Sequence, residues 1–130
     1  MRPVRWLRLA AVAMLATAGG AVTAATPVHA SPSCSHYIDW YHNNYEVVAS
    51  NRISCNMGMY EVWARVALTA PTYVPNDNLC MPARNCSATT YTNNRAGTQT
   101  YCAEAWGLWR WDYRDTFGTE LKRISSCISA

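Results

Sequence analysis

The chain has 130 residues, of which 50% are hydrophobic, with 11 Lys and Arg side chains against 8 Asp and Glu. Three of the arginines lie within the first eight residues, so residues 31–130 carry eight basic and eight acidic side chains. This balance, without a basic cluster, argues against nucleic acids and acidic membranes as partners, because both require a concentrated positive face.

The start of the chain has the three-part pattern of a cleavable export signal. Basic residues come first, residues 9–18 form an apolar run, and Val28 and Ala30 occupy the positions that signal peptidase reads. The apolar run is shorter than the roughly 18 residues that cross a bilayer, which makes a membrane anchor the lesser alternative. We predict a bacterial signal peptide over residues 1–30 and one secreted domain over 31–130, with no membrane attachment after cleavage.

Six cysteines follow the predicted signal and none precedes it. An even number of cysteines in a short exported domain predicts a disulfide framework, because the thiols meet in an oxidising compartment. Fifteen pairings are open, and the spacing does not choose among them. The pairing that we expect first is Cys34–Cys55, Cys80–Cys86 and Cys102–Cys127, and its main rival joins Cys80–Cys127 and Cys86–Cys102.

The first elements of the domain are predicted to be strands. Residues 37–48 place tyrosines at every fourth position, as a helix would, but their aromatic and β-branched composition favours two strands with a turn at Asn43 and Asn44. Residues 59–69 alternate strictly, with small and branched apolar residues on one face and Glu61 and Arg65 on the other. A period of two with this composition indicates a half-buried strand.

The middle of the domain is predicted to be loops. Residues 70–72 and 74–78 contain proline and asparagine in combinations that are typical of turns. Residues 91–97, which combine asparagines with Gly97, are predicted to form a hairpin loop.

The last elements return to strand patterns. Residues 98–112 alternate again, with a bend or bulge expected at Gly107, and residues 116–127 fit a final strand or a short helix. Several short strands separated by turns and joined by disulfides predict an all-β domain, a small stapled β-sandwich or barrel.

Catalytic and metal-binding motifs are weak. His36, Asp39 and His42 invite a metal site, yet the spacing matches no known chelating motif, and two surface imidazoles beside a turn are the simpler interpretation. The cysteines are assigned to bridges, and no serine occurs in a nucleophile elbow. We therefore predict that the protein is not an enzyme and holds neither a metal nor a cofactor.

The densest group of recognition residues lies in residues 106–115, which hold four large aromatic side chains, two arginines and two acids. Trp, Tyr and Arg are enriched at binding hot spots. A competing interpretation makes the alternating aromatic residues the core face of a strand, with Arg110 marking its exposed face. The predicted binding residues are Trp106, Trp109, Arg110, Trp111, Tyr113 and Arg114.

The cysteine layout resembles that of small secreted α-amylase inhibitors of the tendamistat type. Cys34 opens the domain, an aromatic pair at Trp40 and Tyr41 follows, Cys55 precedes a strand rich in valine, and Cys127 lies near the end. The resemblance implies a disulfide-bonded β-sandwich and an exposed Trp-Arg-Tyr triplet that blocks an enzyme. Here only Trp40 matches that triplet in place, and Cys86 and Cys102 are additional.

These observations predict a secreted binding protein without catalytic activity, either an inhibitor of another extracellular protein, such as a hydrolase, or a ligand for one. One alternative is an adaptor subunit of an extracellular bacterial toxin or surface assembly that pairs an exposed sheet edge with its partner. Another alternative is a carbohydrate-binding module, since indole rings stack on sugars.

Overall fold

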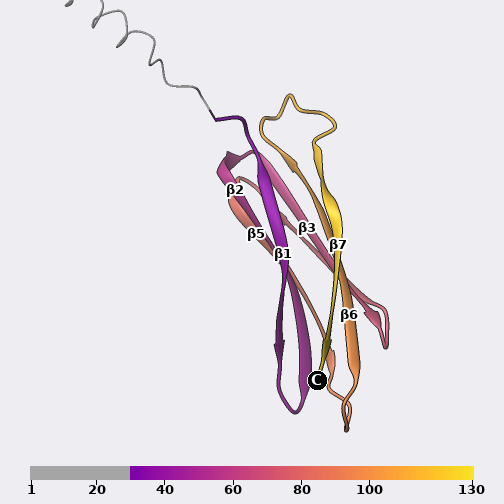
Figure 1. The fold of residues 1–130 in the computed structure, drawn as a ribbon. Helices are drawn as coiled ribbons and strands as arrows, with labels where there is room; N and C mark the ends of the chain where they lie inside the picture. Colours follow the sequence, from indigo (N-terminus) through magenta and orange to yellow (C-terminus); the bar gives the residue numbers. More distant parts are fainter. Residues whose placement is uncertain (1–29) are drawn as a thin grey trace, which may run out of the picture. The chain divides into compact units, whose positions relative to one another are not determined.

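The computed structural model describes residues 30–130, so the predicted signal peptide falls, apart from Ala30, outside the described residues. Residues 32–130 form one unit of seven strands (Figure 1), which confirms the predicted all-β domain. Within the described part of the chain, no helix has the length and hydropathy needed to cross a membrane. The strands are β1 (Cys34–His42), β2 (Glu46–Met59), β3 (Glu61–Ala70), β4 (Val74–Cys80), β5 (Ala83–Asn93), β6 (Thr100–Arg110) and β7 (Thr119–Ser129).

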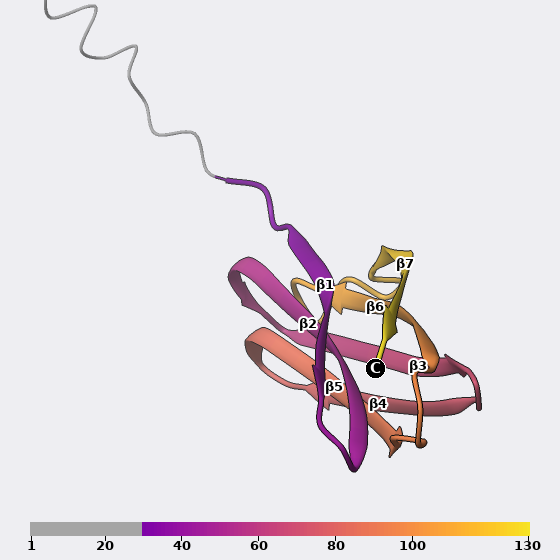
Figure 2. The same ribbon diagram turned by 60° about the horizontal axis from the view of Figure 1, so that its bottom comes forward.

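The strands form two antiparallel sheets that pack face to face as a sandwich (Figure 2). Sheet A has the order β1-β2-β5, and sheet B has the order β4-β3-β6-β7. The chain crosses between the sheets from β2 to β3, from β4 to β5 and from β5 to β6. Sandwich packing places alternate residues of each strand in a shared core, which explains the period of two in the sequence.

The core lies between β2, β3 and β6. Val62, Ala64 and Val66 are fully buried, whereas Trp63 and Arg65 between them are partly exposed on the outer face of sheet B. The alternation predicted for residues 59–69 is therefore confirmed except at Ala67, which the pattern placed on the face of Glu61 and Arg65 but which is fully buried. The strand β3 starts at Glu61, because Met59 ends β2 and the chain reverses at Tyr60.

A buried amide joins the two sheets through the core. Asn51 on β2 has no exposed surface, and its Nδ2 donates to the backbone carbonyls of Arg65 (3.0 Å) and Trp106 (2.9 Å) on sheet B. Its Oδ1 lies 3.0 Å from Nδ1 of His36 on β1. Every polar atom of the Asn51 amide thus has a partner, as a buried polar group requires.

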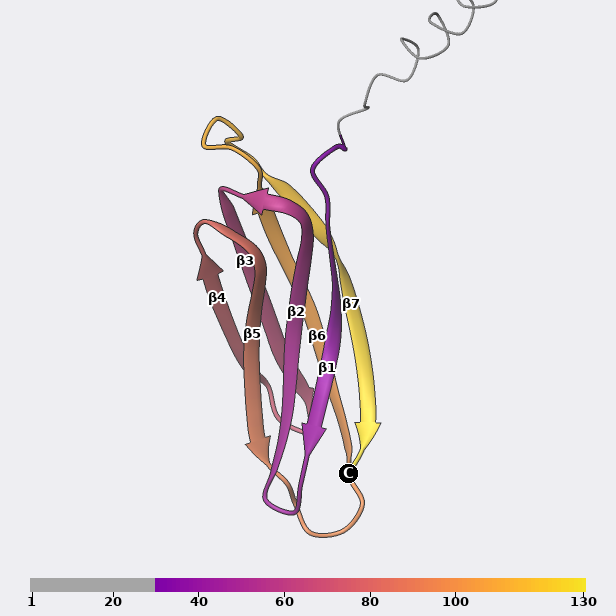
Figure 3. The same cartoon turned by 90° about the vertical axis from the view of Figure 1, so that its left-hand side faces the viewer.

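At the two long sides of the sandwich, β4 lies beside β5 and β1 lies beside β7 (Figure 3), and side chains link the two strands of each pair. In the β4–β5 seam, Asn76 and Asn78 donate to the β5 carbonyls of Thr89 (2.6 Å) and Ser87 (2.9 Å). In the β1–β7 seam, Trp40 Nε1 donates to Ser126 Oγ at 3.1 Å. His36 Nε2 also lies 2.8 Å from the backbone carbonyl of Lys122 in this seam.

The three disulfides have the pairing that was expected first, and the rival pairing is wrong. Cys34–Cys55 joins directly opposed residues of β1 and β2, and Cys102–Cys127 does the same for β6 and β7. Cys80–Cys86 joins β4 to β5 and so links sheet B to sheet A. Each sheet therefore has one bridge between two of its strands, and the third bridge links the two sheets.

Several local predictions are confirmed. The N-terminal segment forms two strands around a turn at residues 43–45, in which Asn43 Oδ1 accepts hydrogen bonds from the backbone of Tyr45 and Glu46. The C-terminal segment is a strand, β7, rather than a helix. A bulge does occur near Gly107, but the extra residue belongs to β7, because two steps along β6 oppose three along β7.

Two loop predictions are wrong. Residues 74–78, predicted as a turn, belong to β4, whose Pro75 is tolerated because β4 is the edge strand of sheet B. Residues 91–97 do not close a hairpin, because β5 and β6 belong to different sheets. Tyr101 fixes this crossover instead, since its hydroxyl accepts from Arg95 N and donates to Asn94 Oδ1.

Candidate functional site

The six predicted binding residues fall into three environments. Trp109 is 8% exposed and packs in the core, as the competing interpretation of this segment required. Trp106 and Arg110 lie on the outer face of sheet B, opposite Arg65 and Glu61 of β3. Trp111, Tyr113 and Arg114 lie beyond the end of β6, so the interpretation that the alternating aromatic residues form one core face of a strand is wrong for Trp111 and Tyr113.

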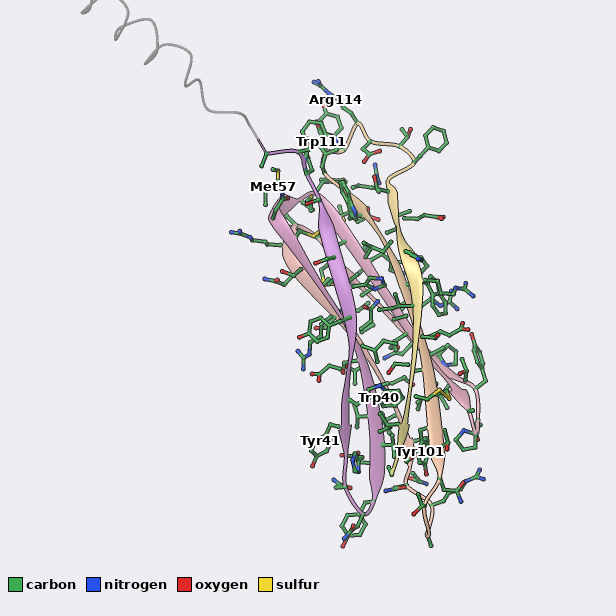
Figure 4. All side chains as sticks on the ribbon, viewed as in Figure 1. Trp40, Tyr41, Met57, Tyr101, Trp111 and Arg114 are labelled. Carbon is green, nitrogen blue, oxygen red and sulfur yellow. A yellow bond between two sulfur atoms is a disulfide. The ribbon has the colours of Figure 1, made fainter. Side chains whose placement is uncertain are left out.

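The residues beyond β6 form the β6–β7 loop, which comprises residues 111–118. The loop projects beyond the strands at one end of the sandwich and carries Trp111 and Arg114 (Figure 4). Three of its aromatic side chains are largely exposed: Trp111 by 55%, Tyr113 by 61% and Phe117 by 90%. A group of exposed aromatic side chains on one loop typically marks an interaction site.

Arg110 anchors the β6–β7 loop to sheet B. Its guanidinium donates to the backbone carbonyls of Asp115 and Tyr113, and it pairs with the Glu61 carboxylate at 3.2 Å. The same group lies 5.4 Å from the ring centre of Tyr60. The planar fork of arginine has donors enough for all three partners at once. Arg110 thus positions the loop, while the exposed aromatic side chains supply its contact surface.

The backbone of the loop is closed by its own bonds. Asp115 N donates to Asp112 O at 3.0 Å, and Gly118 N donates to Asp115 Oδ1 at 3.0 Å. Gly118 has φ of 68°, and a Cβ at that position would lie 2.8 Å from Leu108 Cδ2 and 2.9 Å from Trp109 O. Only glycine fits this left-handed position without strain. The loop is therefore held at its base, at its middle and at its return into β7.

Other apolar side chains lie at the same end of the sandwich. The β2–β3 and β4–β5 connections both reach this end, because Glu61 pairs with Arg110 and Cys80 pairs with Val62. Met81 is 51% exposed, and Figure 4 shows Met57 at this end as well. Methionine is adaptable and recurs at binding surfaces. We call this region, comprising the β6–β7 loop together with Met57 and Met81, the loop end.

Trp106 belongs to a different surface, on the outer face of sheet B. The guanidinium of Arg65 lies 5.0 Å from its ring centre and that of Arg123 lies 4.6 Å from it, and these arginines come from the two strands that flank β6. Arg65 also lies 6.0 Å from the ring of Trp63, whose indole N–H donates to Asp77. Alternating indole and guanidinium groups stabilise this face by cation–π contacts.

The residues considered for a metal or catalytic site are not brought together. His36 faces Asn51 and the β7 backbone, whereas Asp39 lies on the opposite side of β1 and pairs with Arg52 at 2.8 Å. Within residues 30–130, no three His, Cys, Asp or Glu side chains are close enough to hold a metal ion. Trp40, which the inhibitor resemblance placed in an exposed triplet, faces β7 and is partly buried.

Phe117 and the positioning roles of Glu61 and Asp115 were missed in the sequence. The usable signal was the Asp115-to-Gly118 stretch, which is typical of a turn in which an acidic side chain accepts a backbone N–H and glycine follows. It would have placed Phe117 in a turn between two strands.

No protein-family model, curated protein or solved structure matches this chain.

Proposed function

We propose that the protein is a secreted binding protein without catalytic activity, which inserts its β6–β7 loop into a recess on another extracellular protein as an inhibitor or a ligand. The observation that carries the proposal is the exposure of Trp111, Tyr113 and Phe117 on a loop held by Arg110. A loop that is ordered before binding loses little conformational entropy, so more of its contact energy contributes to affinity.

The remaining features support this proposal. Three disulfides are consistent with an extracellular protein. Two acidic side chains near the loop have structural partners. Glu61 forms an ion pair with Arg110, and the Asp115 carboxylate accepts a hydrogen bond from the backbone N–H of Gly118. The near-neutral charge of residues 31–130 favours recognition through shape and apolar contact over electrostatic attraction.

The alternative of an adaptor subunit receives less support. Pairing a partner strand requires an edge with unpaired backbone groups. Here β5 carbonyls accept from Asn76 and Asn78, and the carbonyl of Lys122 on β7 faces His36. These side chains occupy backbone carbonyls at both seams, so a contact through the loop end is favoured over strand addition.

Capture of the partner tests the proposal. The purified secreted protein is immobilised and exposed to culture medium of its source, and bound proteins are identified by mass spectrometry. The unchanged protein and a Tyr45→Ala/Tyr73→Ala control, altered at the opposite end, should capture the same partner. The Trp111→Ala/Phe117→Ala variant should lose it. Equal capture by all three proteins would reject the β6–β7 loop as the binding surface.

A further inference from the structure

A second candidate surface lies on the outer face of sheet A, away from the β6–β7 loop. Tyr41, Val48 and Tyr91 stand directly opposite one another across the three strands. Tyr37 lies four residues before Tyr41 on β1, and all three tyrosines are between 57% and 66% exposed. Tyrosine provides a rigid aromatic face with a hydroxyl at its tip, which suits it to recognition.

A hollow of about 390 Å³ opens beside Tyr37 on this face. The buried residues Ile53 and Cys86 lie at its base, and Arg52, Ser54, Asn85 and Ser87 also line it. Ser54, Asn85 and Ser87 are exposed; Ser54 on β2 faces Asn85 on β5, and Ser87 faces Arg52. An aromatic wall beside convergent polar groups is the usual composition of a small-molecule subsite.

The polar groups of this hollow are available to a ligand and carry no net charge. The side chains of Ser54, Asn85 and Ser87 have no hydrogen-bond partner within residues 30–130. The charge of Arg52 is balanced by Asp39, whose carboxylate lies 2.8 Å from Arg52 Nε. A matching ligand is therefore neutral, has many hydroxyl groups and presents an apolar face to the tyrosine.

We propose that the outer face of sheet A binds a neutral saccharide chain. A pyranose ring has an apolar C–H face that stacks on Tyr37 and hydroxyl groups that bond to Asn85 and Ser87. Tyr41 and Tyr91 are two strand spacings apart, roughly 10 Å, and Tyr37 lies roughly 13 Å along β1 from Tyr41. These spacings suit a chain of several sugar units that crosses the sheet.

The larger hollow on sheet B does not offer the same chemistry. It has a volume of about 550 Å³ and is lined by Trp63 and Trp106. However, arginines flank Trp106, and the indole N–H of Trp63 is bonded to Asp77. Its aromatic faces are engaged within the protein, whereas the three tyrosines of sheet A are exposed.

Titration calorimetry with defined oligosaccharides tests the proposal. The neutral probes are cellohexaose, xylohexaose and chitohexaose, and the charged probes are hexagalacturonate and the chitosan hexamer. At least one neutral probe should bind more tightly than both charged probes. Tyr37→Ala and Asn85→Ala should each weaken binding about tenfold or more, which a loss of about 1.4 kcal/mol would produce. Tyr37→Phe, which keeps the ring, should retain binding.

The melting temperature of each variant serves as a folding control, and both altered side chains are exposed. Trp111→Ala should leave saccharide binding unchanged, which separates this proposal from the function of the β6–β7 loop. The proposal is overturned if no neutral probe binds, if a charged probe binds best, or if Tyr37→Ala and Asn85→Ala bind as the unchanged protein does. Loss of a protein partner in Tyr37→Ala, without saccharide binding, would assign this face to a protein interface instead.

Discussion

Gly107 is a residue at which neighbouring atoms of both sheets leave no room for a side chain. It lies on the inner face of β6 beside the carbonyl groups that Asn51 bonds. A Cβ at this position would lie 2.5 Å from the backbone oxygen of Trp63 and 2.9 Å from Ile53 Cδ1. Glycine is therefore required here by close approach of neighbouring atoms, whereas Gly118 is required by its positive φ.

The Gly107→Ala variant should be destabilised by about 1 to 3 kcal/mol, because the added methyl group meets backbone that cannot move freely. Urea denaturation followed by circular dichroism measures this loss. Gly58→Ala is the matched control, since no atom lies within 4 Å of its added Cβ. Equal stability of the two variants would show that β3 and β6 accommodate the methyl group.

At the scale of elements, the β6–β7 loop depends on one side chain from the strand that precedes it. Arg110 contacts two loop carbonyls and Glu61, and the side chains of both Arg110 and Glu61 are about one-fifth exposed. A partly buried arginine with several partners positions a loop more firmly than an exposed ion pair does.

Arg110→Ala should loosen the loop while leaving the sheets folded. Chymotrypsin should then cleave at Trp111, Tyr113 or Phe117 faster than in the unchanged protein, roughly tenfold if about 1.4 kcal/mol of anchoring is lost. Peptide mapping by mass spectrometry locates the cut. The matched control is Arg95→Ala in the β5–β6 crossover. If Arg110→Ala is cleaved no faster than this control, the loop is ordered without Arg110.

The sequence predicted elements best where burial differs between the two faces of a strand. Residues 61–66 show the alternation plainly, because only one face of this part of β3 meets the core. The β4 strand was mistaken for a turn because an edge strand tolerates Pro75 and exposes most of its residues. The period of two also does not say which sheet a strand joins, so the crossover after β5 looked like a hairpin.

The candidate site was only partly predictable for a related reason. Trp109 and Trp111 are two residues apart and continue one pattern, yet one is in the core and the other is on the loop. What separates them is the end of β6 at Arg110, whose guanidinium bonds to Glu61 of β3 and to the carbonyl of Asp115 in the loop. Composition located the segment, and tertiary contacts decided the role of each side chain.

At the scale of the whole domain, three disulfides support a modest core. The separation between bridged residues is 21 for Cys34–Cys55, 25 for Cys102–Cys127 and 6 for Cys80–Cys86. A longer loop restricts the unfolded chain more, so its bridge stabilises the folded state more. The two bridges that lie within a sheet, Cys34–Cys55 and Cys102–Cys127, should therefore stabilise the folded state more than the short Cys80–Cys86 bridge between the sheets.

Replacing Cys34 and Cys55 by alanine should cost about 1 kcal/mol more than replacing Cys80 and Cys86, on the loop-closure model. Guanidinium denaturation of the two double variants measures the difference. The other four cysteines should resist thiol labelling in each variant, which serves as the control for correct pairing. A larger loss from the Cys80/Cys86 variant would show that linking the two sheets outweighs closing the longer loop.

We propose that Trp109 supports the fold and Trp111 supports binding. The melting temperature and the affinity for the captured partner, measured together on Trp109→Ala and Trp111→Ala, test this division of roles. Trp109→Ala should lose about 3 to 5 kcal/mol of stability, and the milder Trp109→Phe should melt between it and the unchanged protein. Trp111→Ala should melt normally and bind about thirtyfold more weakly, as loss of a 2 kcal/mol hot spot implies. Normal melting with unchanged affinity in Trp111→Ala would show that Trp111 has no part in binding.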